Sequence, residues 1–300
     1  MKKWLISGLL ILGVGIIGAL LSFNGTDWRN FGTKPYFEEK TVDLGDARKL
    51  HIESVSLDVK VIPGNGQMVV VRLEGKASPK FHDNFAFSAE RAGDTIEIES
   101  SMDNYISFGL NIVDVKLTVE LPKQSWDEMT LESRSGNILV RELEAKGVKI
   151  NMNSGNSVIE KIHAATLDFA GTSGNLKIID TDTEQLNFKL NSGNAVVSNT
   201  TGVTKGKTNS GNIVFRTDSL QHSLTLQART GNINVETNQE PASAWLKATV
   251  SSGNIKNNWS GLAADAQSEH SLTGGIGGAN SNAALVVELE TTSGNIRVGR

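Results

Sequence analysis

The stretch LESRSGNILV (residues 131–140) recurs 19 residues later as INMNSGNSVI (150–159), and again as FAGTSGNLKI (169–178) and FKLNSGNAVV (188–197). All four stretches share the tripeptide Ser-Gly-Asn, and apolar residues tend to precede and follow it at alternate positions. Alternation with period two is the pattern of a β-strand that buries one face. The sequence therefore predicts two half-buried strands joined by a tight turn in each repeat.

The same turn continues to the end of the chain. Including one Thr-Gly-Asn copy and the degenerate Thr273-Gly274-Gly275, the turns start at Ser135, Ser154, Ser173, Ser192, Ser210, Thr230, Ser252, Thr273 and Ser293. Successive starts lie 18 to 22 residues apart, which makes nine copies. A fixed short period indicates a repeat fold in which each unit buries its apolar face against its neighbours. We predict an all-β fold, a single-stranded parallel β-solenoid with one Ser-Gly-Asn turn in each rung of about 20 residues.

The turn residues have a structural explanation. Gly supplies the backbone freedom of a sharp corner. Asn tolerates the left-handed region and hydrogen-bonds to nearby backbone, so stacked Asn side chains are expected to form a ladder along the solenoid. The alternative is that the Ser and Asn rows form a ligand-binding surface. Calcium-binding β-rolls place Asp in a nonapeptide repeat, whereas this turn carries neutral Asn at a longer period, and we expect no calcium in it.

The repeat is less regular near its end, where Asn257, Glu269 and Gly278 occupy columns that are mostly apolar in the earlier copies. A bulged rung or a protruding loop within residues 259–282 explains this irregularity. An irregular rung can also bind a partner, so this segment is a candidate for function. The β-rich segment before residue 125 is the other candidate.

The chain begins with an uncharged apolar segment, WLISGLLILGVGIIGALLSF (residues 4–23), which follows Lys2 and Lys3. A helix of this length spans roughly the 30 Å hydrocarbon core of a bilayer. The apolar run is longer than that of a signal peptide, and its end lacks an Ala-x-Ala cleavage site. We predict an uncleaved single-pass anchor, with a cleaved signal as the alternative. The two lysines favour a cytoplasmic N-terminus, which places the bulk of the chain outside the cell membrane.

The sequence divides into four segments. Residues 1–23 are the predicted anchor and residues 24–40 a membrane-proximal linker. Residues 41–125 contain irregularly spaced β patterns and form either a cap or diverged rungs, and residues 126–300 are the repeat array. A cap is required because the first rung would otherwise leave an open edge for pairing with other chains.

The sequence offers no group of residues suited to catalysis or to holding a cofactor. The chain has no cysteine, which excludes disulfides, thiolate metal sites and cysteine nucleophiles. Asp180 and Asp182 form the closest acidic pair, but they lie in a return segment that is expected to face water. The histidines lack metal-ligand spacing; they are His51, His82, His163, His222 and His270. We predict no enzyme activity and no catalytic, cofactor-binding or metal-binding residues. The net charge of −4 gives no reason to expect a nucleic-acid partner.

The order of these features resembles the LiaG-like family of candidate bacterial adhesins, which are β-strand repeat proteins. The resemblance covers about residues 40–300 and rests on the N-terminal apolar segment, Ser56-Leu57-Asp58-Val59-Lys60-Val61, Val119-Glu120-Leu121-Pro122-Lys123 and the repeats. The family commonly has Asp in the third turn position, where this chain has Asn almost throughout. The resemblance implies a cell-envelope protein, linked in some relatives to envelope stress.

We predict a non-catalytic, membrane-anchored envelope protein that presents an extracytoplasmic β-solenoid for binding or scaffolding. Its expected partner is an envelope protein or a cell-wall polymer. One alternative is a regulatory partner of a membrane signalling complex for envelope stress, with the anchor taking part in recognition. Another is an enzyme that cleaves wall polysaccharide, which would require carboxylates that converge on one groove.

Overall fold

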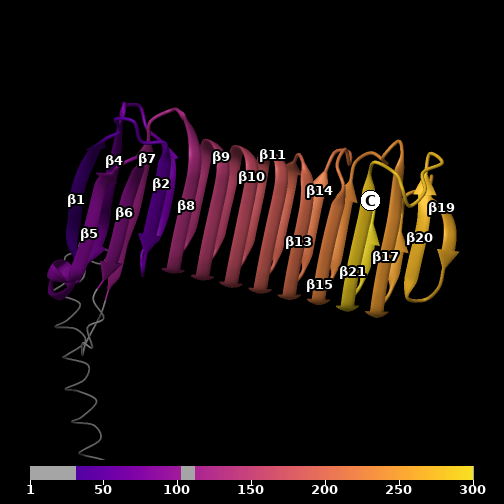
Figure 1. Cartoon of the computed structure of the whole chain (residues 1–300). Helices are drawn as coiled ribbons and strands as arrows, with labels where there is room; N and C mark the ends of the chain where they lie inside the picture. The colour runs from indigo at the N-terminus through magenta and orange to yellow at the C-terminus, as the bar shows by residue number, and fades with distance from the viewer. Residues whose placement is uncertain (1–31, 103–111, 300) are drawn as a thin grey trace, which may run out of the picture.

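A computed structural model describes residues 32–102 and 112–299. The predicted anchor, residues 4–23, lies outside the described residues. Within the two described ranges, no helix is long and apolar enough to cross a bilayer. The described chain consists mainly of β-strands, with almost no helix, and its rungs stack along one axis between an N-terminal and a C-terminal cap (Figure 1).

Each rung of the array consists of a strand before the turn and a strand after it. The strands before the turns form the first sheet, and the strands after the turns form the second sheet. Three 17-residue strands run from the second sheet of one rung into the first sheet of the next; they are β9 (Ile138–Ser154), β10 (Ser157–Ser173) and β11 (Leu176–Ser192). The first sheet also contains β8 (Ser125–Ser135), β13 (Val203–Ser210), β15 (Leu224–Thr230), β17 (Ala244–Ser252) and β21 (Val286–Ser293). The second sheet also contains β12 (Ala195–Thr200), β14 (Ile213–Thr217), β16 (Ile233–Thr237), β18 (Ile255–Asn257) and β22 (Ile296–Val298).

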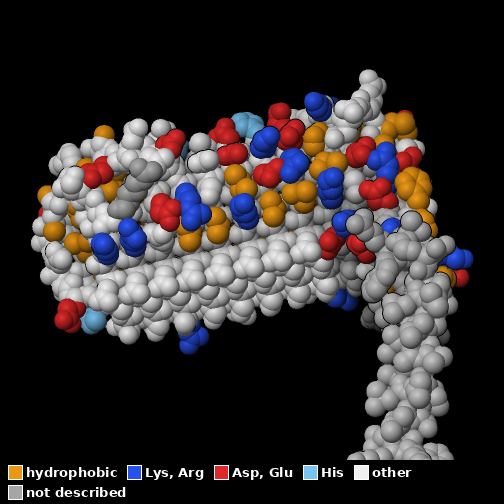
Figure 2. Space-filling model, turned by 180° about the vertical axis from the view of Figure 1, so that it is seen from behind, with side chains coloured by type: hydrophobic (Ala, Val, Ile, Leu, Met, Phe, Trp, Pro, Cys, Tyr) orange, Lys and Arg blue, Asp and Glu red, His pale blue; other side chains and the backbone are white. Residues whose placement is uncertain are grey.

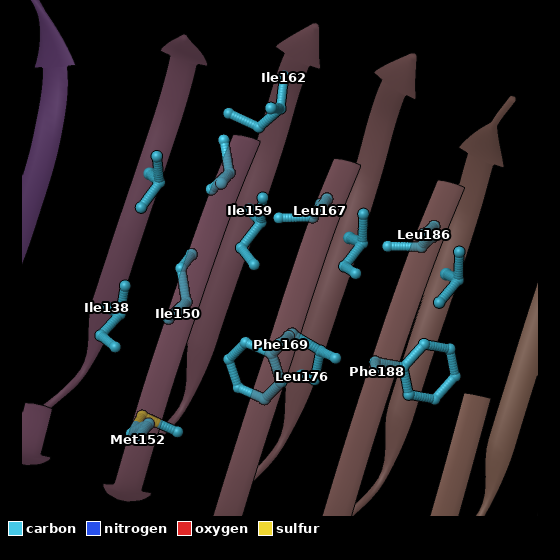
Figure 3. Close-up of a cluster of buried hydrophobic side chains, with 14 of the residues drawn as sticks. Ile138, Ile150, Met152, Ile159, Ile162, Leu167, Phe169, Leu176, Leu186 and Phe188 are labelled. Carbon is cyan, nitrogen blue, oxygen red and sulfur yellow. The ribbon is translucent and has the colours of Figure 1, made fainter. Parts of the chain in front are cut away.

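Strands of neighbouring rungs pair in parallel with the register that the repeat predicts. Ser154 pairs with Ser135 and with Ser173, and the same position pairs again in the following rungs. The predicted parallel β-solenoid is therefore confirmed. The inward-facing apolar residues of both sheets form one continuous buried core. Figure 3 shows part of this core, with Phe169 and Phe188 in the same row of adjacent strands.

The Asn side chains of the turns form the expected ladder. Asn156 donates from its backbone N and from Nδ2 to Oδ1 of Asn137, at 3.0 and 3.3 Å. The next turns repeat this arrangement along the array. The ladder begins at Asp58, whose Oδ1 accepts the backbone N–H of Asn137 at 2.7 Å. A carboxylate suits this first position because it accepts these bonds without leaving an amide donor of its own unpaired.

A second corner lies in the return part of the long strands, and sequence analysis did not predict it. Glu142, Lys161, Asp180 and Asn199 occupy stacked positions and have φ between 49° and 54°. Asn and Asp tolerate this region better than most residues. Side-chain contacts also follow the stack: Lys161 lies 3.6 Å from Glu142, and Asn199 donates to Asp180 at 3.1 Å. The corner thus turns the chain from the second sheet towards the first without a glycine.

The C-terminal end departs from the predicted nine turns. The prediction that Thr273-Gly274-Gly275 forms a turn of the array is wrong, because β20 (Ser271–Ile276) pairs antiparallel with β17 and with β19 (Ala263–Gln267). The last rung, β21 and β22, lies between the rung of β15 and β16 and the rung of β17 and β18 (Figure 1). Residues 258–285 therefore leave the array, cap β17, and return one rung further inward. The spacing of Thr273 resembles a repeat, but the backbones of Gly274 and Gly275 pack against Ala263 and Ala279 instead.

The N-terminal segment combines both predicted possibilities, rungs and cap. It contains β1 (Lys34–Asp43), β2 (Lys49–Ser54), β3 (Asp58–Pro63), β4 (Met68–Ala77), a 3-10 helix η2 (Pro79–Asn84), β5 (Phe85–Ala92), β6 (Thr95–Met102) and β7 (Val113–Leu121). β2 and β3 form a rung that pairs in parallel with β8 and β9, and Ser56-Leu57-Asp58 takes the place of Ser-Gly-Asn. β6 and β7 form the rung outside it, while β1, β4 and β5 are antiparallel capping strands. β1 includes residues 34–40 of the segment predicted as a linker.

Candidate ligand-binding groove

Four lysines gather on the outer surface of the first sheet. Lys149 lies on β9, Lys189 on β11, and Lys205 and Lys207 on β13, and all four side chains are exposed. Lys189 and Lys207 are direct partners in adjacent strands. Lys149 and Lys205 lie in one row of the sheet, separated by Asp168 and Asn187. Regular parallel pairing therefore brings together lysines from rungs that lie up to 58 residues apart in the sequence.

These lysines surround a groove of about 500 Å³ that crosses the strands β9, β10, β11, β13 and β15. Its floor includes Ala170, whose methyl group is the shortest outward side chain between Asn151 and Lys189. Gly206 and Phe188 also line it. Phe188 is 3% exposed, because its ring turns inward and fills the space that a side chain at position 206 would need. The groove thus has an apolar floor and a basic, polar rim.

The charge in the groove is not neutralised by the protein. Four lysines and one aspartate line it, which is a formal charge of +3. The aspartate, Asp168, accepts a hydrogen bond from Nδ2 of Asn187 at 2.9 Å. Across residues 32–102 and 112–299, none of the four lysines has a carboxylate at ion-pair distance. Exposed cations that lack a partner are available to an anionic ligand.

The groove is the basic part of a sheet whose charges are segregated. Glu53, Glu99 and Glu132 lie side by side on the strands at its N-terminal side. Glu288 and Glu290 lie on β21 at its C-terminal side, and Gln227 donates to Glu290 at 3.2 Å. Glu288 is paired with Lys247 of β17 at 3.8 Å, so the net charge of −4 conceals a local positive surface beside the acidic one at its N-terminal side.

The second sheet has a different surface, which Figure 2 shows from outside. Half-buried apolar side chains such as Leu139, Val158 and Val196 alternate there with charged ones. Two of its arginines are paired across strands, Arg141 with Glu160 and Arg216 with Glu236. The pale band beside this sheet is the stacked turns, where the Asn amides are occupied by the ladder. These turns are structural, as the sequence analysis favoured.

The residues that the sequence analysis examined for chemistry lie elsewhere. His163 contacts Asp182 at 3.1 Å on the exposed return side, and Thr201 hydrogen-bonds to the same carboxylate. Asp180 belongs to the left-handed corner and accepts from Asn199. In the described part of the chain, no group of three or more His, Asp or Glu side chains is arranged to hold a metal ion.

The irregular segment 259–282 is a cap that is tied to the array. Trp259 is 3% exposed and donates from Nε1 to Oγ1 of Thr237 at 3.0 Å. The carboxylate of Glu240 accepts the backbone N–H groups of Ser260 and Gly261 at 2.6 and 3.0 Å. These bonds and the Ser260 hydroxyl lower the pKa of Glu240 below its ordinary value. The irregularity that marked this segment as a functional candidate is thus explained by its capping contacts.

Sequence analysis missed the groove, although a signal for it was present. Lys149 and Lys205 stand five residues before their turns, and Lys189 and Lys207 stand three residues before theirs. Because side chains alternate along a strand, these positions lie on the outward face, and their common spacing from the turns brings them together.

The fold and this surface define a capped β-solenoid with a basic groove on one sheet. The family model for Toastrack DUF4097 matches residues 47–299, so the chain belongs to the Toastrack family. The resemblance to a family of β-strand repeat proteins is thus confirmed at the level of the Toastrack family, and the narrower LiaG-like assignment stays a prediction.

Solved structures with a similar fold share little sequence with this chain. A candidate adhesin from Bacteroides fragilis NCTC 9343 is 11% identical over 89% of this chain and 97% of its own, with a TM-score of 0.52. A candidate adhesin from Parabacteroides distasonis ATCC 8503 is 10% identical over 88% and 97%, with a TM-score of 0.47. A candidate lipid-binding protein from the same strain is 13% identical over 88% and 96%, with a TM-score of 0.41. A search of curated proteins gave no match. At these identities the similarity shows the fold alone.

Proposed function

We propose that this chain is a non-catalytic binding protein of the cell envelope that holds an anionic ligand in the lysine groove of its first sheet. The observation that carries the proposal is the set of four lysines without acidic partners around a groove of about 500 Å³. In the same proposal, residues 4–23 anchor the chain and the solenoid faces the outside of the membrane. The neighbours described as adhesins or as lipid-binding are compatible with a binding role.

The geometry of the lysines favours a ligand with several negative charges. Lys205 and Lys207 point outward from one strand, roughly 7 Å apart, and Lys189 is about 4.8 Å from Lys207 in the strand spacing. Phosphate esters suit such a row of ammonium groups because each contact is a charge-assisted hydrogen bond. The apolar floor at Ala170 and Gly206 fits the carbon skeleton between the phosphates. The ligand class is therefore a phosphodiester polymer or an anionic lipid headgroup.

The lining of the groove argues against the polysaccharide-cleaving alternative. Two carboxylates are needed for general acid–base cleavage of a glycosidic bond. Asp168 is the one carboxylate of the lining, and Asn187 occupies it. The four lysines can bind and orient a ligand. Without a neighbouring carboxylate pair, they do not supply both the general acid and the general base that cleavage requires.

The test measures binding of the full chain, held in lipid nanodiscs of neutral lipid, to two probes. One probe is poly(glycerol phosphate) and the other is a vesicle that contains phosphatidylglycerol, with dextran and phosphatidylcholine vesicles as neutral counterparts. K205Q/K207Q removes two groove lysines and is expected to weaken binding about thirtyfold, from about 1 kcal/mol for each basic residue. The preferred probe distinguishes polymer from headgroup.

The matched control is K60Q/K177Q, which removes two lysines from the second sheet without breaking an ion pair of the described chain. Its binding should stay within twofold of the parent chain. Equal losses in both double variants would show general electrostatic attraction and would refute the groove.

The side of the membrane on which the solenoid lies can be tested with a single cysteine, Q221C, because the chain has no cysteine of its own. An impermeant maleimide should label Q221C in intact cells. Labelling only after lysis would refute an outward-facing solenoid.

A further inference from the structure

The C-terminal end of the solenoid is closed on one sheet and open on the other. In the first sheet, β20 pairs antiparallel with β17 and so covers the last rung. In the second sheet, β18 pairs in parallel with β22, and no other strand of the described chain lies beside it. The rung of β17 and β18 is therefore capped along only half of its length.

The open half carries backbone groups that point away from the array. The carbonyl oxygens of Ser252 and Asn254 face inward, where they accept from Gly294 and Ile296 at 3.0 Å each. Because successive residues of a strand alternate, the N–H groups of Gly253 and Ile255 face outward. At the equivalent positions one rung inward, Gly294 and Ile296 donate to the neighbouring rung. Gly253 and Ile255 have no neighbouring rung to receive their bonds among residues 32–102 and 112–299.

The Asn ladder is open at the same end. Asn254 donates its backbone N–H to Oδ1 of Asn295 at 2.9 Å, like the Asn of each earlier turn. In the earlier turns the Oδ1 atom accepts from the rung that follows, as Asn232 does from Asn295. No further turn of the described chain follows Asn254. The edge thus presents the N–H groups of Gly253 and Ile255 and the Oδ1 atom of Asn254 at the spacing of one further rung.

The side chains at this edge indicate which residues would complete it. Ile255 is half-buried, whereas the equivalent Ile233 and Ile296 are fully buried, so one apolar residue on an added strand would cover it. Lys256 is exposed and lies beside Arg297 in the row of β22. Neither has a carboxylate at ion-pair distance in the described chain. An acidic residue next to the apolar one would lie beside Lys256, with Arg297 one strand further inward.

We propose that the open edge of β18 is a strand-addition site for an extended acidic peptide segment of a partner protein. The peptide pairs with residues 253–257, places an apolar side chain over Ile255 and an acidic one beside Lys256. Main-chain hydrogen bonds supply affinity and alternate side chains supply specificity in this mode of recognition. The edge is short, which keeps it from pairing indiscriminately with other chains. This inference is independent of the lysine groove, which lies on the other sheet.

The test uses the full chain in nanodiscs and three fluorescent heptapeptides based on residues 292–298, Thr-Ser-Gly-Asn-Ile-Arg-Val. The first carries Glu in place of Arg, the second carries Lys there, and the third is the Glu peptide with N-methylated backbone nitrogens on alternate residues. Fluorescence anisotropy should show binding of the Glu peptide about two- to fivefold tighter than the Lys peptide, as expected for one exposed ion pair. The N-methylated peptide should not bind, because it lacks the donors of the added strand.

Two variants locate the site on the chain. K256E should reverse the preference between the Glu and Lys peptides, while K177E, a lysine in the same row further inward, should leave it unchanged. I255P removes an outward N–H and should abolish binding without loss of a bond to β22. Circular dichroism shows whether each variant keeps its β-structure. Equal binding of the Glu and Lys peptides, or an effect of K177E equal to that of K256E, would overturn the proposal. So would a tail-to-tail dimer that excludes both peptides.

Discussion

Replacing the glycine of a central turn by alanine, G174A, tests how tightly the rungs stack. Gly174 has φ +125°, a conformation that costs residues with a side chain about 1–3 kcal/mol. A Cβ at this position would also overlap the carbonyl oxygen of Gly155 in the rung beside it. The obstructing atom belongs to the backbone of Gly155, so no side chain can move aside to make room. The two turns therefore have to separate.

Separation of these turns weakens the bonds between them. Gly155 donates to Ser173 at 3.1 Å, and Ser157 donates to Asn175 at 2.8 Å. Loss of one or two such bonds costs about 0.5–1.5 kcal/mol each. Adding the conformational cost gives a destabilisation of about 1.5–6 kcal/mol for G174A.

Two other glycines separate these contributions. Gly278 has φ +77° and open space around it, so G278A should cost about 1–2 kcal/mol from conformation alone. Gly147 has no positive φ, and its Cβ would meet nothing nearer than Thr166 Oγ1 at 3.5 Å. G147A should therefore change stability by less than about 1 kcal/mol, or stabilise slightly.

The assay is guanidinium unfolding of the full chain in nanodiscs, with hydrogen exchange as a local readout. The guanidinium concentration at the unfolding midpoint should be highest for G147A, lower for G278A and lowest for G174A. Exchange of the amides of Gly155 and Ser157 should quicken in G174A, because stability in a solenoid depends on contacts between nearest neighbours. A midpoint for G174A equal to that of G147A would refute the close stacking of the turns.

Two further predictions concern the core and the C-terminal cap. G206A should cost about 1–3 kcal/mol, because its Cβ would overlap the ring of Phe188. In a double-mutant cycle, F188L should recover part of that loss, and additive effects would contradict the contact. The depressed pKa of Glu240 means that its bonds stabilise the cap above the ordinary glutamate pKa and lose that effect as the pH falls through the lowered value. Acidification should therefore lower the protection of the Ser260 and Gly261 amides, relative to their intrinsic exchange rates, in the parent chain but not in E240Q. Identical pH profiles of protection would contradict the assignment.

Much of the array was predictable because its rules are local. The inward columns beside each turn have a period of two, and this pattern alone indicates which residues are buried. Phe169 and Phe188 could be assigned to one core row from their positions relative to Ser173 and Ser192. The Asn ladder also followed, since the same amide recurs once in each turn.

The ends and the groove could not be predicted by the same rules. Thr273-Gly274-Gly275 has the spacing of a turn, yet β20 pairs antiparallel with β17. Sequence spacing does not reveal whether a segment joins the stack or folds back over it, because both arrangements bury alternate residues. The lysines of the groove were visible in the sequence as outward residues. Their lack of acidic partners depends on which rungs are neighbours.

The sequence by itself determined the repeating unit, its turn and its buried columns, because these depend on backbone conformation and on the alternation of side chains within one rung. Only the tertiary structure decided the order of the terminal rungs, in which β21 and β22 lie inside β17 and β18. That order depends on pairing between strands far apart in the sequence, such as Ser252 with Ser293, which the pattern within one rung does not specify. It closes the first sheet with β20, and it leaves the edge of β18 open.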